Sequence, residues 1–352
     1  MRAWLLLLLL AAPVVAEPHG PIRIVSNSDF LNPSNGVSGG SGTPADPYII
    51  EDLEIDQDLL GLDIAQTAIH IEATTAHVVL RGVTVETSFA GAIKVLDARN
   101  VTIEDLRLGQ QRQGVWVDGA RDIRVDGAQI SGTGGIDPFA VAVSDSHRVV
   151  LRAIDVGPGE GPAVQVTNSR FVRIEGAALR GHDDGLRIQG SDDVDLVSVS
   201  AAQNRGDGVW LHNISRLDAR GLVAHGQLAV GGANTGRGIL AWNVDGRMVN
   251  VQAVGNAAVG MVLFDAPVAV TSAQFLENGG VGLHAEGSRV DVRNVEAHGN
   301  RLQGVAFFGG PDGGVVAGEA LRIHDNGAAG VYVAGMGRVD LHDVRSESNE
   351  GA

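Results

Sequence analysis

The chain has 352 residues, of which 44% are hydrophobic, 4% aromatic and 19% charged, and it contains 49 glycines and no cysteine. The apolar fraction excludes a disordered chain, and the lack of cysteine excludes disulfides and thiolate sites. With 42 acidic against 26 basic residues, the formal net charge is −16. A field of that sign repels polyanions, so we expect no nucleic-acid partner.

Residues 1–16 are predicted to be a secretory signal peptide. Arg2 supplies the positive end, Leu5 to Leu10 form a short apolar core, and Val14-Val15-Ala16 fits a cleavage site of small residues. The apolar run is shorter than the roughly 20 residues of a membrane-spanning helix, which disfavours an anchor. We therefore expect a secreted, periplasmic or cell-surface protein with no transmembrane segment after cleavage.

Residues 17–56 are predicted to form an N-terminal cap. This segment contains a glycine-rich run, Gly36 to Gly42, followed by Pro47-Tyr48-Ile49-Ile50. A phosphate-binding loop is not indicated, because no Gly-Lys-Ser/Thr follows the glycines. An uncovered end of stacked strands would be an aggregation edge, and a cap protects it.

Residues 57–352 carry a repeat of about 22 residues, which is typical of a solenoid with one coil per repeat. Apolar residues stand one and three positions after each glycine or alanine anchor, and this alternation predicts strands. Two more short alternating runs follow in each repeat, so we expect three strands per coil and an all-β parallel solenoid of about twelve coils. The anchors are Ala68, Ala92, Gly114, Ala140, Ala163, Gly185, Gly208, Gly238, Gly260, Gly282, Gly304 and Gly330.

An asparagine column supports this register. Asparagine tolerates turn backbone, and stacked amides can form a ladder between coils. Because Asn349 also occupies the column position, the next anchor would fall just past Ala352, so we expect the solenoid to continue in a longer protein; a native end capped by a partner is the alternative. The other members, four residues before an anchor, are Asn204, Asn256, Asn278, Asn300 and Asn326.

These repeats resemble right-handed parallel β-helices of the pectate-lyase-like superfamily, and the segment from Gly36 to Ile50 resembles the leader of NosD-like β-helix proteins. The resemblance implies a right-handed β-helix over about residues 48–352. Enzymes of that superfamily place their substrate groove on the sheet formed by the anchor-led strands, here called the first sheet. The repeat is also shared by adhesins and other surface proteins, so it does not fix an activity.

The outward column of the first sheet, two residues after each anchor, contains no Asp or Glu. Insertions at Ser131 to Phe139 and His225 to Arg237 precede first-sheet strands and are expected to flank a cleft. Tryptophans four coils apart, about 19 Å at the spacing of strands, suit an extended glycan. The expected ligand-binding residues are Lys94, Trp116, Gln165, Arg187, Trp210 and His212.

Asp184 and Asp207 each precede an anchor on consecutive coils. Such a pair can hold Ca²⁺ or serve as the two carboxyls of a retaining glycosidase. By the resemblance, Arg187 can neutralise a uronate or take part in β-elimination. Turn formation alone also explains Asp-Gly pairs. The polygalacturonase pattern is incomplete, since no Gly-His-Gly is present and Arg187-Ile188-Gln189 replaces Arg-Ile-Lys.

Two further features indicate partners. An apolar outward stripe suggests a covering segment, a second copy of the chain or an envelope protein. His298, His324 and Glu347 share one position on successive coils and could bind Zn²⁺ or Cu²⁺. The NosD-like resemblance implies copper handling, but polar turn residues are expected at this position in any case. The stripe comprises Leu240, Trp242, Val262, Phe264, Phe308 and Tyr332.

The sequence therefore favours a secreted or surface β-helix protein that binds a glycan or an envelope partner without catalysis. The alternatives are a polysaccharide lyase or glycoside hydrolase acting in the first-sheet cleft, and a NosD-like protein of copper-site maturation. Glycosylation sequons begin at Asn100 and Asn213.

Overall fold

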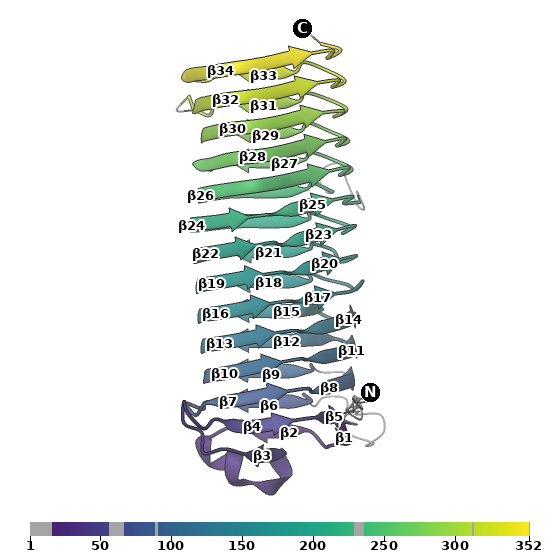
Figure 1. Ribbon diagram of the computed structural model, residues 1–352, viewed down its shortest axis with the longest axis vertical. Coiled ribbons are helices and arrows are strands. Elements are labelled where there is room, and N and C mark those ends of the chain that lie inside the picture. The colour runs from purple at the N-terminus through teal and green to yellow at the C-terminus, as the bar shows by residue number, and fades with distance from the viewer. Residues whose placement is uncertain (1–15, 56–66, 89–90, 229–235, 312, 352) are drawn as a thin grey trace, which may run out of the picture.

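The computed structural model describes residues 16–55, 67–88, 91–228, 236–311 and 313–351. The coils stack into one elongated column with the N-terminal residues at one end and the C-terminal residues at the other (Figure 1). Neighbouring coils pair in parallel through three successive strand columns, which we call the first, second and third sheets. The predicted all-β parallel helix of about twelve coils is confirmed. The predicted signal peptide lies outside the described residues except for Ala16.

The first sheet is built from short strands, and all of them except β2 are led by predicted anchors. They are β2 (Ile22–Ile24), β6 (Ile69–Glu72), β9 (Ile93–Leu96), β12 (Gln113–Asp118), β15 (Phe139–Ser144), β18 (Val164–Thr167), β21 (Leu186–Gln189), β27 (Met261–Phe264), β29 (Leu283–Glu286), β31 (Val305–Phe308) and β33 (Val331–Ala334).

The second sheet follows the first along each coil, and the third sheet follows the second. The second-sheet strands are β4 (Tyr48–Glu51), β7 (Val78–Arg81), β10 (Arg99–Glu104), β13 (Arg121–Asp126), β16 (His147–Arg152), β19 (Arg170–Glu175) and β22 (Asp192–Val197). The third-sheet strands are β1 (Glu17–Pro18), β5 (Leu53–Ile55), β8 (Thr84–Ser88), β11 (Arg107–Gln111), β14 (Gln129–Thr133), β17 (Asp155–Val156), β20 (Ala178–Arg180), β23 (Ser200–Ala202) and β25 (Val223–His225).

Toward the C-terminus the corners between sheets become continuous strand. In β24 (Val209–Arg220) one strand serves the first and second sheets, and β26 (Ile239–Val254) serves all three. Four more strands serve the second and third sheets. They are β28 (Val268–Leu276), β30 (Arg289–His298), β32 (Val315–His324) and β34 (Arg338–Glu347).

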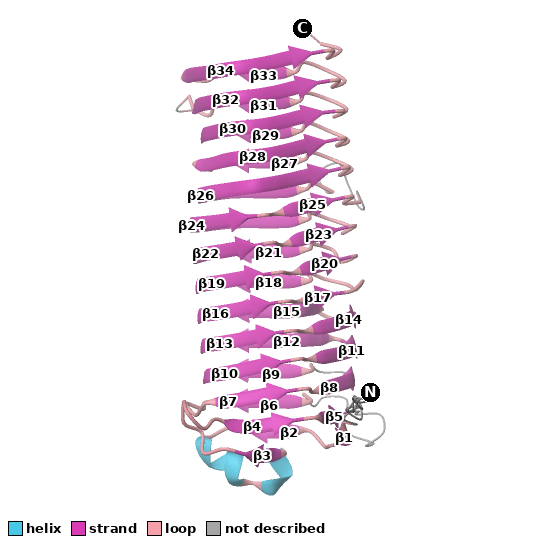
Figure 2. Cartoon of the chain, in the orientation of Figure 1, coloured by secondary structure: helices cyan, strands magenta, loops and turns pink. Residues whose placement is uncertain are grey.

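The N-terminal segment, predicted as a cap over residues 17–56, contributes strands to the stack itself. Strands β1 and β2 pair in parallel with β5 and β6, while β4 and β5 pair with β7 and β8. Among the described residues, the two short 3₁₀ helices, η1 (Asn27–Leu31) and η2 (Pro33–Asn35), and β3 (Val37–Gly39) extend past the first coil (Figure 2). Strand β3 runs antiparallel to β4, unlike the pairings of the solenoid.

The core lies inside the column. Alternation points every second side chain of each strand inward, and stacking then places like residues above one another. The inward side chains are mostly Ile, Val, Leu and Ala, and the large rings of Phe275 and Phe307 are fully buried near the C-terminal end. Burial of these columns, repeated from coil to coil, is the main source of stability in a chain without disulfides.

The predicted asparagine ladder is present inside one corner. The Asn256 amide donates to Asn278 Oδ1 at 2.9 Å, and the same contact links Asn278 to Asn300 and Asn300 to Asn326 at 2.9 Å. Sequence reasoning left a gap between Asn204 and Asn256, and Gln227 fills it. Its Oε1 accepts from the Asn204 backbone amide at 2.8 Å. Each ladder side chain thus satisfies buried backbone groups of adjacent coils.

Candidate functional site

The outward column of the first sheet has the register expected from the anchors. Strand pairing places Lys94 beside Trp116, Gln165 beside Arg187, and Arg187 beside Trp210. The column begins at Arg23, which pairs with His70. In these coils it carries cations and tryptophans and no carboxylate, so the six predicted ligand-binding residues share one face. His212 lies on that face two residues after Trp210.

Two of the cations lie over tryptophan rings. The Lys94 ammonium is 4.9 Å from the centre of the Trp116 ring, and the Arg187 guanidinium is 4.6 Å from the centre of the Trp210 ring. The ring quadrupole attracts a cation placed there. Within the described part of the chain, neither Lys94 nor Arg187 forms an ion pair, so both retain charge for a ligand.

Trp116 is flanked on its other side by the first insertion. The Phe139 ring packs edge-on against it with centroids 6.3 Å apart. The Arg112 guanidinium is held close by, where its Nε donates to the Ile136 carbonyl at 2.8 Å. Burial lowers the pKa of Lys94, and the positive charge of Arg112 adds to this effect. The predicted flanking loop is therefore in contact with the face; most of the second loop, residues 229–235, lies outside the described residues.

His212 lies between two tryptophans. Its ring centre is 5.3 Å from that of Trp210 and 5.0 Å from that of Trp242. Its Nδ1 is buried without a hydrogen-bond partner among the described residues. The imidazole thus joins the cationic part of the face to the aromatic part that follows.

Asp184 and Asp207 lie close together, but their carboxylates have different hydrogen-bond partners. The Asp184 Oδ1 accepts a hydrogen bond from the Asp207 backbone amide at 2.9 Å. The carboxylate of Asp207 instead receives a bidentate contact from Arg237, with Nε at 2.9 Å and Nη2 at 2.7 Å. The Asp207 side chain is only 6% exposed. A retaining glycosidase needs two free carboxyls, and this pairing leaves only Asp184 free.

Burial raises the pKa of Asp184, and the hydrogen bond from the Asp207 amide opposes that shift. The charge of Asp207 also raises it, while Arg187 lowers it. A carboxyl with a raised pKa close to an arginine that forms no ion pair is the kind of group that can take or give a proton in catalysis. Among the described residues of this face, Asp184 is therefore the acid–base candidate that the geometry supports.

Unlike Lys94 and Arg187 on the first sheet, Arg216 and Arg247 on the second sheet form ion pairs. Arg247 donates to Asp218, with Nη2 at 2.7 Å, and Arg216 pairs with both Asp192 and Asp193. The Arg216 hydrogen bond lowers the pKa of Asp193 to about 2. These charges neutralise one another between coils, so these two arginines have little charge left for a ligand.

The predicted apolar stripe continues the first-sheet face toward the C-terminus. Leu240 pairs with Val262, and Trp242 with Phe264, in the expected register. Leu240 and Val262 are buried at 5% exposure each, so only the aromatic members remain open. His284 stacks on Phe308 at 4.9 Å, and Phe308 contacts Tyr332 at 5.3 Å.

The predicted metal ligands lie on successive coils of the column. His298 pairs with His324, whose rings stack 4.9 Å apart, and His324 pairs with Glu347. The described residues contain no group of three His, Asp or Glu side chains that could hold a metal ion. The structure therefore adds nothing in favour of copper or zinc at this position, and Asp207, committed to Arg237, is a poor ligand for Ca²⁺.

Sequence reasoning missed Arg237 and the contact from Phe139. The signal for Arg237 was present, because it precedes Gly238 just as Asp184 and Asp207 precede their anchors. The long insertion concealed it, since the step to Gly238 is the longest in the repeat. The two glycosylation sequons have these contacts. Asn213 is exposed, and its Oδ1 accepts a hydrogen bond from the Asn243 amide at 2.8 Å. The Asn100 amide donates to the Thr75 carbonyl at 3.0 Å.

Comparisons with known proteins agree with the fold. Residues 67–216 match the family model described as the right handed beta helix region. A mutant of the periplasmic alginate epimerase AlgG is 12% identical, with a TM-score of 0.62, over 86% of this chain and 85% of that chain. The unmodified AlgG structure gives a TM-score of 0.52 at 12% identity, over 93% of this chain and 84% of that chain.

The A-module of a mannuronan C-5 epimerase from Azotobacter vinelandii is 14% identical, with a TM-score of 0.44, over 93% of this chain and 96% of that chain. None of the curated proteins matches the sequence significantly. No helix of the described residues is long and apolar enough to span a membrane. The parallel coils give the described residues a right-handed parallel β-helix fold, and the family model matches residues 67–216 of it.

Proposed function

We propose that this protein is exported and binds an extended acidic polysaccharide along the outward face of its first sheet. The observation that carries the proposal is the unpaired Arg187 guanidinium stacked on Trp210, with Lys94 on Trp116 repeating the arrangement four coils away. The predicted signal peptide at residues 1–16 supports export to the periplasm, the cell surface or the medium.

The two cation–tryptophan units suit a polymer better than a small ligand. They are separated by four coils, about 19 Å at the spacing of stacked strands. A polyuronate can bring a carboxylate to each cation and lay sugar rings over the exposed parts of the tryptophans. Gln165, between the units in register, can donate to hydroxyls. The net charge of −16 opposes such a ligand, so affinity must come from this local face.

Calorimetry with oligomers of alginate and of polygalacturonate tests the proposal. Alginate is included because the similar folds contain alginate epimerases. Charge-assisted contacts contribute roughly 1.5 to 3 kcal/mol, so Arg187→Ala should weaken binding on the order of 10- to 100-fold. Arg216→Ala removes the same charge from the second sheet and should leave the affinity unchanged. Absence of binding to both polymers by the parent chain refutes the proposal.

A second candidate function is cleavage or epimerisation of the same polymer by proton transfer. It is favoured by the raised pKa of Asp184 beside Arg187, since one group can move a proton and the other can neutralise a uronate carboxylate. In that case Asp184→Asn abolishes turnover and spares binding. A rise in ultraviolet absorbance marks a lyase, and a change in uronate composition without chain shortening marks an epimerase. Repeating both assays with a chelator tests whether Ca²⁺ takes part.

A further inference from the structure

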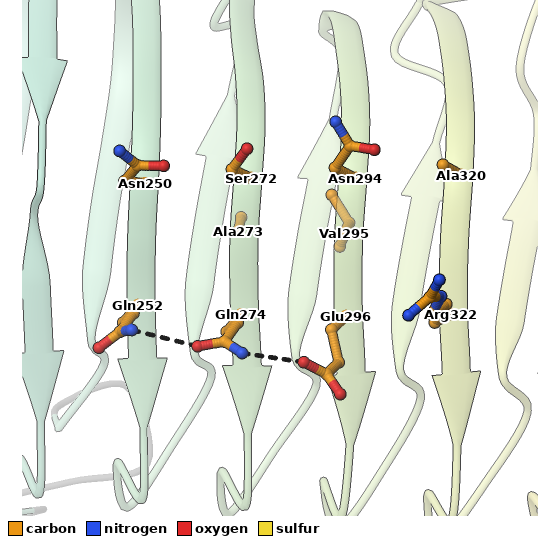
Figure 3. A pocket seen from close by; sticks show the side chains of 10 residues that line it. All are labelled: Asn250, Gln252, Ser272, Ala273, Gln274, Asn294, Val295, Glu296, Ala320 and Arg322. Carbon is orange, nitrogen blue, oxygen red and sulfur yellow. Dashed lines mark hydrogen bonds between the residues drawn. The ribbon is translucent and has the colours of Figure 1, made fainter.

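A polar groove lies on another face of the column, at the corner where the second sheet turns into the third. It has a volume of about 520 Å³ and crosses β26, β28, β30 and β32. Figure 3 shows its side chains arranged in two rows that run from coil to coil. This volume is in the range of ligand sites in proteins.

The corner backbone creates the groove. Asn250, Ser272 and Asn294 adopt left-handed backbone with φ of 56°, 57° and 52°, and Ala320 continues the row at 57°. At each of these residues the strand changes direction from the second sheet to the third, and the groove lies along this line of bends. Within the described residues, the side chains of Asn250, Ser272 and Asn294 make no hydrogen bond to protein, which leaves their donors and acceptors free.

A second row stands on the third-sheet side of the corner. Gln252 pairs in register with Gln274, Gln274 with Glu296, and Glu296 with Arg322. The Gln252 amide donates to Gln274 Oε1 at 3.1 Å, and the Gln274 amide donates to Glu296 Oε2 at 2.9 Å (Figure 3). This chain fixes the direction of each amide, so the remaining donors and acceptors present a repeating pattern.

The charges of the lining balance. Glu296 is its one carboxylate and Arg322 its one guanidinium, and both stand in the same row. Unlike the first-sheet face, the groove has no excess of cations to attract a polyuronate. Carboxamides, a hydroxyl and single opposite charges match the alternating donors and acceptors of sugar hydroxyls.

The spacing of the rows favours a glycan over a peptide as the ligand of the groove. Each row repeats once per coil, about 4.8 Å. An extended peptide presents equivalent groups on one side every second residue, about 6.6 Å, and would lose register within two coils. A pyranose in an extended chain is close to one coil in length. We propose that this groove binds a neutral oligosaccharide of at least three sugar units running parallel to the solenoid axis.

The test uses the whole chain and a panel of neutral hexasaccharides: cellohexaose, mannohexaose, xylohexaose, chitohexaose and maltohexaose. At least one should bind with a dissociation constant below about 1 mM by calorimetry. Gln274→Leu breaks both links of the amide chain and removes contacts to the ligand, so affinity should fall by about three- to tenfold. Asn294→Leu, in the other row, should give a similar loss.

Gln110→Leu is the matched control. Gln110 is an exposed glutamine of β11 that lies outside this groove, and its replacement should not change hexasaccharide binding. Thermal melting of each variant shows whether the fold is retained. Binding of none of the five sugars, or equal binding by the parent and both groove variants, overturns the proposal. Because Gln274→Leu should leave polyuronate binding intact, failure here is distinguishable from failure at the first sheet.

Discussion

Cationic side chains on the outward faces of the first and second sheets differ in whether a carboxylate pairs with them. On the second sheet, Arg216 and Arg247 are held by aspartates of the preceding coil. On the first sheet, Arg187 and Lys94 lie on tryptophan rings with no carboxylate to neutralise them in the described structure. The difference lies in the side chains that stand beside these cations.

The contrast indicates that an outward face of a solenoid can bind a charged ligand where its side chains do not already pair with those of the next coil. Stacked identical positions bring charges within one coil spacing, so like charges repel and opposite charges neutralise one another. A face of alternating Arg and Asp is therefore stable and inert. A face that leaves cations unpaired depends on the rings beneath them, and it remains available to a polyanion.

The largest effect is expected at the ion pair between Arg237 and the buried Asp207. Arg237→Ala leaves the buried carboxylate of Asp207 without its partner, and loss of one member of such a pair costs about 3 kcal/mol or more in free energy of unfolding. Arg216→Ala, in the exposed second-sheet pairs, should cost at most about 1 kcal/mol. Urea unfolding of both variants measures the difference. Equal losses would show that the two faces are not energetically distinct.

The tryptophan platforms should matter on one face only. Trp210→Ala removes the ring beneath Arg187 and the surface offered to the sugar, so polyuronate affinity should fall about tenfold. Phe171 is the matched control, because the Arg170 guanidinium lies 5.0 Å from its ring centre but is already paired with Asp192 and Asp193. Phe171→Ala should leave affinity unchanged; a parallel loss in both variants would contradict a dedicated first-sheet site.

A smaller effect should appear with pH. Because burial raises the pKa of Asp184, its carboxyl becomes neutral at a higher pH than an ordinary aspartate. Protonation removes a charge that repels a uronate, so affinity should increase about two- to fivefold as pH falls from 7 through that raised pKa. Asp184→Asn should bind more tightly at pH 7 and lose this dependence. Calorimetry at several pH values checks both, and a parent whose affinity weakens over the same range would argue against the placement of the ligand beside Asp184.

The smallest effect concerns acid stability of the second sheet. The Arg216 hydrogen bond lowers the pKa of Asp193 from 3.8 to about 2. A depressed carboxyl pKa stabilises the fold at pH above the unfolded value, and that contribution disappears as pH falls through the folded value. The melting temperature should therefore drop between pH 4 and pH 2, and Arg216→Gln should flatten this drop slightly. If Arg216→Gln leaves the pH dependence of the melting temperature unchanged, then Arg216 does not lower the pKa of Asp193 in the folded protein.

Most of the fold could be predicted because its signals are periodic. The anchors set the strand register, and every predicted neighbour in the outward column, from His70 to Tyr332, is confirmed by the pairing. The gap filled by Gln227 was missed because the column was defined by asparagines four residues before an anchor, and the insertion places Gln227 eleven residues before Gly238. The N-terminal segment was expected only to cap, since its strands are too short and irregular to show the repeat.

By itself the sequence determined the solenoid, its three sheets and the residues that face outward, because alternation and a fixed step dictate direction without knowledge of contacts. Only the tertiary structure decided which charges are satisfied. Asp184 and Asp207 occupy equivalent positions in sequence, yet Arg237 neutralises one and leaves the other free. That choice depends on a side chain brought across a long insertion by coil stacking, and a repeat period carries no information about which neighbour an individual carboxylate will meet.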